Sequence, residues 1–116
     1  TDEDAARAAR KMHDDGTRIV CIKLSDGGCM LCAEGETRKI EAPTVEAVDK
    51  TGAGDAFTAA LAVALLEGRS PVEAASWGVA ASTMAVTKAG SQEAYPSRDE
   101  LEIMVRRVHA LRDGAD

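Results

Sequence analysis

The segment VDKTGAGDAFTAALAVALLEG, from Val48 to Gly68, constrains the fold of this chain more than any other. From Gly54 onward its apolar residues recur at helical spacing, and Gly68 is a suitable residue to end a helix. Glycine is the poorest helix former after proline, so a helix that begins with two glycines and an aspartate needs a local reason. The pattern predicts an apolar helix whose first turn serves a purpose other than helix stability.

The start of this helix has the features of an anion site. Gly52 and Gly54 have no Cβ, so the backbone can adopt a positive φ and approach a ligand closely. Successive N–H groups in such a turn can converge on an anion, and the helix N-terminus adds roughly half a positive charge. We therefore expect Gly52, Ala53 and Gly54 to hold phosphate oxygens.

Asp55 lies in the first turn of the same helix. A carboxylate beside a bound phosphate repels it unless the carboxylate faces another group, such as a hydroxyl that attacks the phosphorus. A base in that position typically contributes about 10² to 10⁴ to the rate. Judged alone, the short glycine pattern favours the simpler interpretation, in which Asp55 is a helix N-terminal acid stabilised by the dipole.

The N-terminal part of the chain predicts one helix and several strands. Thr1 as N-cap and Asp4 as an acidic N3 residue begin a helix over about 2–15. Four extended segments are then expected, RIVCIKL, CMLCA, TRKIEA and TVEAV, of which the middle two form a hairpin around EGE. Strands followed by helices favour an α/β unit with a small sheet and helices packed on it.

Two more helices are predicted after the segment described first. The motif SPVE at 70–73 is a capping box with proline at N1, and it begins a helix that ends near Lys88. Ser97 with Glu100 caps the last helix. The two middle helices carry very few charges, so we expect both to be largely buried. Burial on that scale requires cover from further chain or from a partner, such as a second copy.

The bulk properties exclude several classes of protein. With 116 residues the chain has room for one compact domain, and its net charge of −6 argues against nucleic acid or an anionic membrane as the main partner. The three cysteines form no disulfide framework, and no apolar run reaches the roughly 18 residues that a membrane span needs. We expect a cytoplasmic protein. Because Thr1 is not an initiator Met, we also expect the chain to be a piece of something longer.

The segment around GAGD closely resembles the C-terminal signature D-T-x-G-A-G-D-x-F of the ribokinase-like (PfkB) carbohydrate kinases. KLSDGG resembles the family's turn between strands near the nucleotide, and MAVTKAGSQEAYP resembles the helix end and loop around the adenine and the monovalent cation. The resemblance implies that residues 1–116 are a single partial domain, the nucleotide-binding C-terminal part of a three-layer α/β/α fold. It also implies ATP-dependent phosphoryl transfer to a primary hydroxyl of a sugar-like acceptor.

The resemblance assigns roles to individual positions. Asp55 matches the catalytic base, which takes the proton of the acceptor hydroxyl, and Gly52, Ala53 and Gly54 match the anion hole for the transferring phosphoryl group. The positions that match the ATP site are Ser25, Asp26, Gly27, Gly28, Gly54 and Val79, the last by apolar packing against adenine. The positions that match monovalent-cation ligands are Asp49, Thr51 and the backbone carbonyls of Ala85, Lys88 and Gly90.

Two departures from the family pattern leave potassium dependence open. Lys50 stands where the signature has a small hydroxyl residue, and Ala94 stands where ribokinases often supply a side-chain oxygen to the cation. The resemblance covers roughly the C-terminal third of such a kinase. Most Mg²⁺ ligands and the acceptor site are therefore expected outside this chain, and ribose, fructose, a ketodeoxy acid or a nucleoside all fit as acceptor.

Other functions also fit parts of the sequence. The main one is a non-catalytic nucleotide-binding fragment or interaction module without an acceptor site. A Rossmann dinucleotide site is disfavoured because the turn is G-A-G-D rather than G-x-G-x-x-G. Cys29 and Cys32 have the spacing of zinc ligands, but strand alternation points them to opposite faces, which predicts buried apolar cysteines instead. His13 and His109 are expected on solvated helix surfaces.

Overall fold

The computed structural model describes residues 1–87 and 97–113. Over these residues the chain forms, in order, α1 (Asp2–Asp14), β1 (Ile19–Lys23), β2 (Cys29–Ala33), β3 (Glu36–Ile40), α2 (Ala53–Leu66), α3 (Pro71–Ala85) and α4 (Arg98–Arg112). The predicted capping boxes of Thr1 with Asp4 and of Ser97 with Glu100 are confirmed. Within the described ranges, every helix is too short or too polar to cross a bilayer.

The three strands form an antiparallel sheet in the order β1-β2-β3. Lys23 at the end of β1 pairs with Cys29 at the start of β2, and Ala33 pairs with Glu36 across the next turn. Both residues of that turn, Glu34 and Gly35, have positive φ, as a tight two-residue hairpin turn requires. The predicted hairpin around EGE is therefore confirmed.

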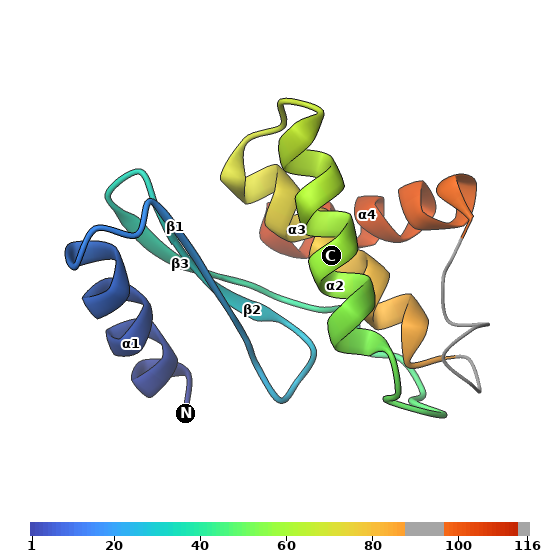
Figure 1. Ribbon diagram of the computed structural model, residues 1–116. Helices are drawn as coiled ribbons and strands as arrows, with labels where there is room; N and C mark the ends of the chain where they lie inside the picture. The colour runs from blue at the N-terminus through green and yellow to red at the C-terminus, as the bar shows by residue number, and fades with distance from the viewer. Residues whose placement is uncertain (88–96, 114–116) are drawn as a thin grey trace.

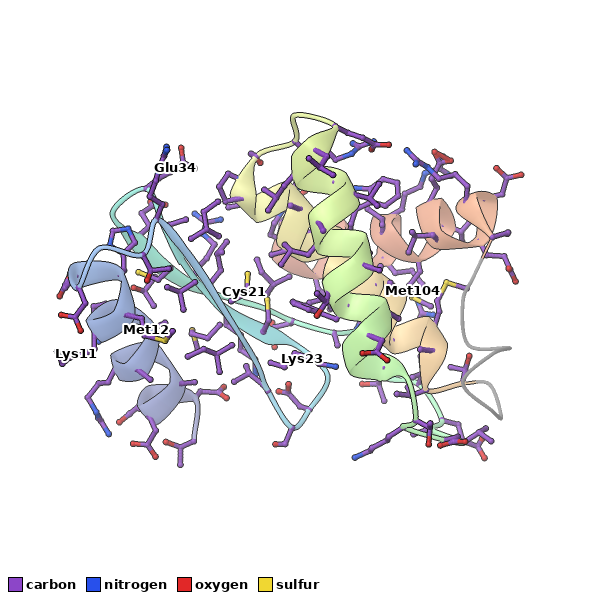
Figure 2. All side chains as sticks on the ribbon, viewed as in Figure 1. Lys11, Met12, Cys21, Lys23, Glu34 and Met104 are labelled. Atoms are coloured by element: carbon purple, nitrogen blue, oxygen red, sulfur yellow. The ribbon has the colours of Figure 1, made fainter. Side chains whose placement is uncertain are left out.

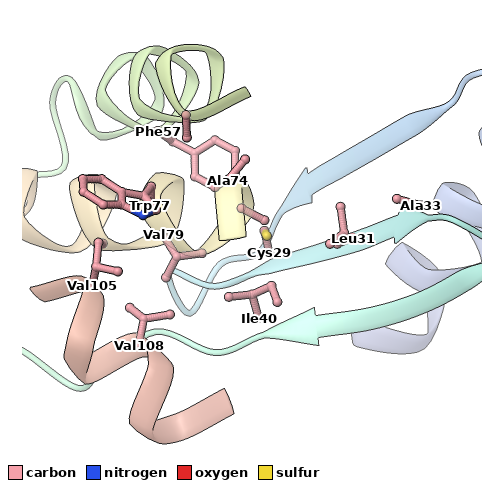
Figure 3. Packing of buried hydrophobic residues seen from close by; sticks show 13 residues of the cluster. Cys29, Leu31, Ala33, Ile40, Phe57, Ala74, Trp77, Val79, Val105 and Val108 are labelled. Carbon is pink, nitrogen blue, oxygen red and sulfur yellow. The ribbon is translucent and has the colours of Figure 1, made fainter. Parts of the chain in front are cut away.

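The sheet lies between two helical layers (Figure 1). One face carries Val20, Met30 and Cys32, which pack against Ala9 of α1. The opposite face packs against α2, α3 and α4, as Figure 3 shows for a cluster that includes Cys29, Leu31, Ala33, Ile40, Phe57, Val79, Val105 and Val108. Alternation along β2 thus sends neighbouring side chains into different layers. The predicted three-layer α/β/α architecture with a small sheet is confirmed.

The two middle helices differ in burial. All residues 74–83 of α3 are buried, as predicted, because α2 and α4 both pack on this helix. On α2, by contrast, Leu66 is 88% exposed and Val63 is 50% exposed. Its neighbours in the described part of the chain pack on one side of α2 only, so the prediction that this helix is largely buried, with cover from further chain or from a partner, stays a prediction.

Two local predictions are wrong. The expected fourth extended segment, TVEAV at 44–48, forms no strand, and the Val48 amide instead donates to the carbonyl of Val86 at 2.6 Å. At the start of α3 the Ser70 hydroxyl accepts from the Glu73 amide at 3.1 Å, so half of the predicted capping box is present. The other half is missing because the Glu73 carboxylate bonds to Trp77, His109 and Arg112 instead.

Candidate functional site

An open pocket of about 660 Å³ lies where four segments meet: the β1–β2 turn, the stretch 41–47, the start of α2 and the last turns of α3. Ser25, Asp26 and Gly27 line it from the turn, and Ala53 and Gly54 line it from α2. These five were all predicted as site residues, and the fold brings them to one concavity although they are far apart in the chain. Nothing in the local sequence pattern requires that.

The β1–β2 turn is held in shape by Asp26. Its Oδ1 accepts from the Gly28 amide at 3.0 Å, and its Oδ2 accepts from Lys39 Nζ at 2.7 Å. The hydrogen bond from Lys39, followed by that from Gly28, keeps the pKa of the Asp26 carboxyl below its usual value. Gly28 itself is buried behind the turn, where an added Cβ would lie 2.5 Å from the Ile40 carbonyl oxygen. The fold thus needs glycine at Gly28, and the pocket wall is made by its neighbours.

The start of α2 has a backbone shaped by Gly52 and Asp49. Gly52 is the N-cap, with φ +85°, and Asp49 Oδ1 accepts from the Thr51 amide at 2.8 Å. The Ala53 amide donates to the Lys50 carbonyl at 3.3 Å. One of the three predicted anion-hole amides therefore has a backbone acceptor in this conformation.

Gly54 is the second residue of α2 and faces open space. The first amides of a helix have no acceptor within the helix, and a Cβ added to Gly54 would meet no atom within 4 Å. Asp55, the next residue, is exposed and not packed in hydrocarbon. This arrangement leaves open space at Gly54 near the N-terminus of α2, with an exposed carboxylate at the next residue.

Two lysines that the sequence reasoning did not assign to the site also line the pocket, Lys23 from β1 and Lys50 from the loop before α2. Lys23 Nζ donates to the Ser82 hydroxyl of α3 at 2.6 Å and lies 5.7 Å from the centre of the Phe57 ring. Figure 2 shows its side chain directed from the sheet toward α2. Burial is the largest cause that lowers the pKa of the Lys23 ammonium group, and the charge of Lys50 lowers it further.

Comparison with known proteins identifies the family. The model of the pfkB family of carbohydrate kinases matches residues 1–98. The chain belongs to the pfkB family. A ribokinase of Haemophilus influenzae is 39% identical to it over 99 residues, which are 85% of this chain and 32% of that protein. The solved ribokinase of Thermotoga maritima matches with a TM-score of 0.80 and 40% identity, over 87% of this chain and 34% of that one.

Two other solved structures carry ligands. Ribokinase of Arabidopsis thaliana in complex with ribose and ATP has a TM-score of 0.72 and 36% identity. The match covers 86% of this chain and 33% of the ribokinase chain. Ribokinase II of Escherichia coli in complex with ATP and Mg²⁺ has a TM-score of 0.78 and 30% identity. This match covers 87% of this chain and 33% of the Escherichia coli chain. This pfkB chain therefore spans about a third of the length of the relatives it matches.

One predicted nucleotide contact of the pfkB chain needs correction. Val79 was expected to pack against adenine, but its side chain is 0% exposed and lies in the core between the helices and the sheet. Its carbonyl is also engaged, because it accepts from the Thr83 hydroxyl at 2.8 Å. Valine fits this position as a core residue, and Ser82 and Thr83, about one turn further along α3, are the residues that line the pocket.

The predicted monovalent-cation ligands of the pfkB chain are partly described. The Val86 carbonyl accepts from the amides of Val48 and Asp49, which holds the loop before α2 against the end of α3, where Ala85 is buried. Asp49 and Thr51 are thus close to the end of α3. Lys88, Gly90 and Ala94 lie outside the described residues.

The remaining candidate metal ligands are the cysteines and the histidines. Cys29 and Cys32 lie in different layers, as predicted, and all three cysteines are free. Among the residues described, no three His, Cys, Asp or Glu side chains come together in a group that could hold a metal ion. His13 and His109 are both partly exposed on their helices, and His109 also contacts the carboxylate of Glu73 at 2.8 Å.

Proposed function

We propose that this chain carries the ATP site, the anion hole and the catalytic base of a kinase that phosphorylates a primary hydroxyl of a sugar or related small molecule. The observation that supports it most is the start of α2, where Gly54 lines the open pocket and Asp55 is exposed beside it. Family membership makes phosphoryl transfer the chemistry to expect at such a site.

The phosphate chain of ATP would lie across the start of α2. The amides of Gly52 and Gly54, with the positive end of the helix, would stabilise the charge on the transferring phosphoryl group. The turn Ser25-Asp26-Gly27 lines the same pocket and would contact the nucleotide. The proposed anion hole would consist mainly of the amides of Gly52 and Gly54, because the third, that of Ala53, donates to the Lys50 carbonyl.

Asp55 would act on the acceptor. Its carboxylate takes the proton of the primary hydroxyl as the oxygen bonds to the γ-phosphorus and the bond from that phosphorus to the β,γ-bridging oxygen breaks, which releases ADP. The proton acceptor and the phosphate-binding amides would then belong to the same helical turn.

The metal ions would be held largely by other parts of the protein. Mg²⁺ neutralises charge on the phosphate oxygens when it is bound with ATP. The described residues offer no cluster of three metal ligands, so we expect most Mg²⁺ ligands elsewhere in the protein. For a monovalent cation we propose Asp49, Thr51 and the backbone carbonyls of Ala85, Lys88 and Gly90 as ligands.

The test is Asp55→Asn in the whole protein, with Asp14→Asn on α1 as the matched control. Turnover of Asp55→Asn with ATP and a panel of sugars should fall by about 10² to 10⁴, while ATP affinity stays within about twofold of wild type. The control should keep both values. Retention of a tenth or more of wild-type turnover would show that Asp55 is not the base.

A second function is favoured by one observation, the exposed apolar side of α2 around Leu66. It fits a chain that binds nucleotide and completes its acceptor site only when another segment covers this helix. Nucleotide binding with no phosphoryl transfer to any acceptor in the panel would support this function over the first.

A further inference from the structure

Two lysine side chains reach the pocket from different parts of the chain. Lys23 ends β1 just before the turn that forms one wall, and Lys50 lies in the loop that leads to α2. They are close enough for the charge of Lys50 to lower the pKa of Lys23. The lining of the pocket therefore combines two like charges with the positive end of a helix.

Neither ammonium group has a carboxylate partner in the described part of the chain. Lys11 bonds to Asp15, and Lys39 bonds to Asp2 and Asp26, but no ion pair involves Lys23 or Lys50 over residues 1–87 and 97–113. Of the two acids that line the pocket, Asp26 is engaged by Lys39, and Glu41 is exposed.

Lys23 is held in position before any ligand binds. The Ser82 hydroxyl accepts from its Nζ at 2.6 Å, and the Phe57 ring lies 5.7 Å away, so two helices fix the end of a normally mobile side chain. An ammonium group has three hydrogens to donate, so one bond to Ser82 leaves donors for a ligand. Preorganisation of this kind reduces the entropy lost on binding.

We propose that Lys23 and Lys50 together bind the phosphate chain of the nucleotide, with Ser82 as a positioning residue for Lys23. The inference rests on the proposed function and deepens it by naming side chains where the sequence had indicated backbone amides alone. An anion between the two lysines offsets their mutual repulsion, which gives this pocket a reason to prefer a polyphosphate over an uncharged nucleoside.

The test compares the affinity of the whole protein for ATP with its affinity for adenosine. Lys23→Met and Lys50→Met should each weaken ATP binding by about 10- to 100-fold, the range expected for loss of a charged hydrogen bond, while adenosine affinity changes little. Lys11→Met, a lysine on α1 outside the pocket, is the matched control and should bind both ligands as wild type does. Lys50→Arg keeps the charge and should retain most of the ATP affinity.

Ser82→Ala separates positioning from direct contact. It should weaken ATP binding less than Lys23→Met does. In the double variant with Lys23→Met it should cause little further loss of ATP affinity, because Ser82 acts through Lys23. Thermal unfolding of each variant checks that the fold is intact, and Lys23→Arg provides a charged substitute if Lys23→Met unfolds.

The outcomes distinguish this proposal from the proposed function. If wild type binds no ATP and transfers no phosphoryl group, the proposed function itself is wrong. Suppose that wild type binds ATP. If both methionine variants then bind ATP as tightly as wild type does, or if their affinity for adenosine falls as much as their affinity for ATP, the proposed role of the two lysines is wrong. The proposed roles of Asp55 and the amides would be unaffected.

Discussion

Gly78 of α3 lies directly against the ring of Phe57 of α2. A Cβ added to Gly78 would be 2.9 Å from Phe57 Cε2, closer than real Cβ contacts come, and 3.2 Å from the Phe57 carbonyl oxygen, which is tighter than most of them. The absence of a side chain at Gly78 therefore sets how closely the two helices approach. Because Phe57 also lies 5.7 Å from the Lys23 ammonium group, the same contact bears on the pocket.

Gly78→Ala should destabilise the protein. In an exposed helix alanine is favoured over glycine by about 1 kcal/mol, but here the ring and the backbone of Phe57 must move, which costs about 1 to 3 kcal/mol. We expect a net loss of unfolding free energy in urea denaturation. A variant as stable as wild type would show that α2 and α3 are not packed as closely as this contact requires.

Gly54→Ala is the contrasting change, at a glycine whose added Cβ meets nothing within 4 Å. Stability should stay the same or rise by up to about 1 kcal/mol, because alanine favours the helix. Phosphoryl transfer should nevertheless fall by about tenfold or more, since the methyl group occupies space proposed for the phosphate. Unchanged kinetics, measured beside unchanged stability, would contradict a phosphate site at this residue.

Glu73 should make stability depend on pH. Burial alone would raise the pKa of its carboxyl, but the hydrogen bond from Trp77, the charge and hydrogen bond of His109 and the bond from Arg112 outweigh burial and lower the pKa. A lowered folded-state pKa adds stability that is complete above the unfolded-state value of 4.5 and is lost as the pH falls through the folded-state value.

Glu73→Gln removes that contribution. At neutral pH the variant should lose about 1 to 3 kcal/mol of unfolding free energy, because charged hydrogen bonds to α4 are lost. Between about pH 5 and about pH 3 its stability should fall less steeply than that of wild type. Glu46→Gln, an exposed acid in the loop before α2, is the control. Parallel pH curves for Glu73→Gln and wild type would refute the role of this carboxylate.

The sequence predicted correctly those features that depend on residues a few positions apart. The caps at Thr1 and Ser97, the tight turn at Glu34-Gly35 and the opposite directions of Cys29 and Cys32 all follow from residue type and spacing over a few positions. The glycines of the GAGD turn predicted the open start of α2 for the same reason.

The errors and omissions concern contacts between distant residues. Lys23 and Ser82 are 59 positions apart, and a lysine at the end of an apolar strand carries no local sign that it will meet a helix hydroxyl. Val79 belongs to the core because three elements meet around it, and Glu73 leaves its cap because α4 supplies His109 and Arg112. The one local signal for the lysine pair was the departure of Lys50 from the family signature.

The antiparallel course of β1 and β2 puts the Glu34-Gly35 turn at the far end of the sheet from the β1–β2 turn that lines the pocket. Figure 2 shows Glu34 and Lys23 at opposite ends of the strands. Both residues of the far turn are exposed. A fluorophore attached at Glu34 would therefore report on tumbling and assembly of the protein while it stayed clear of the pocket.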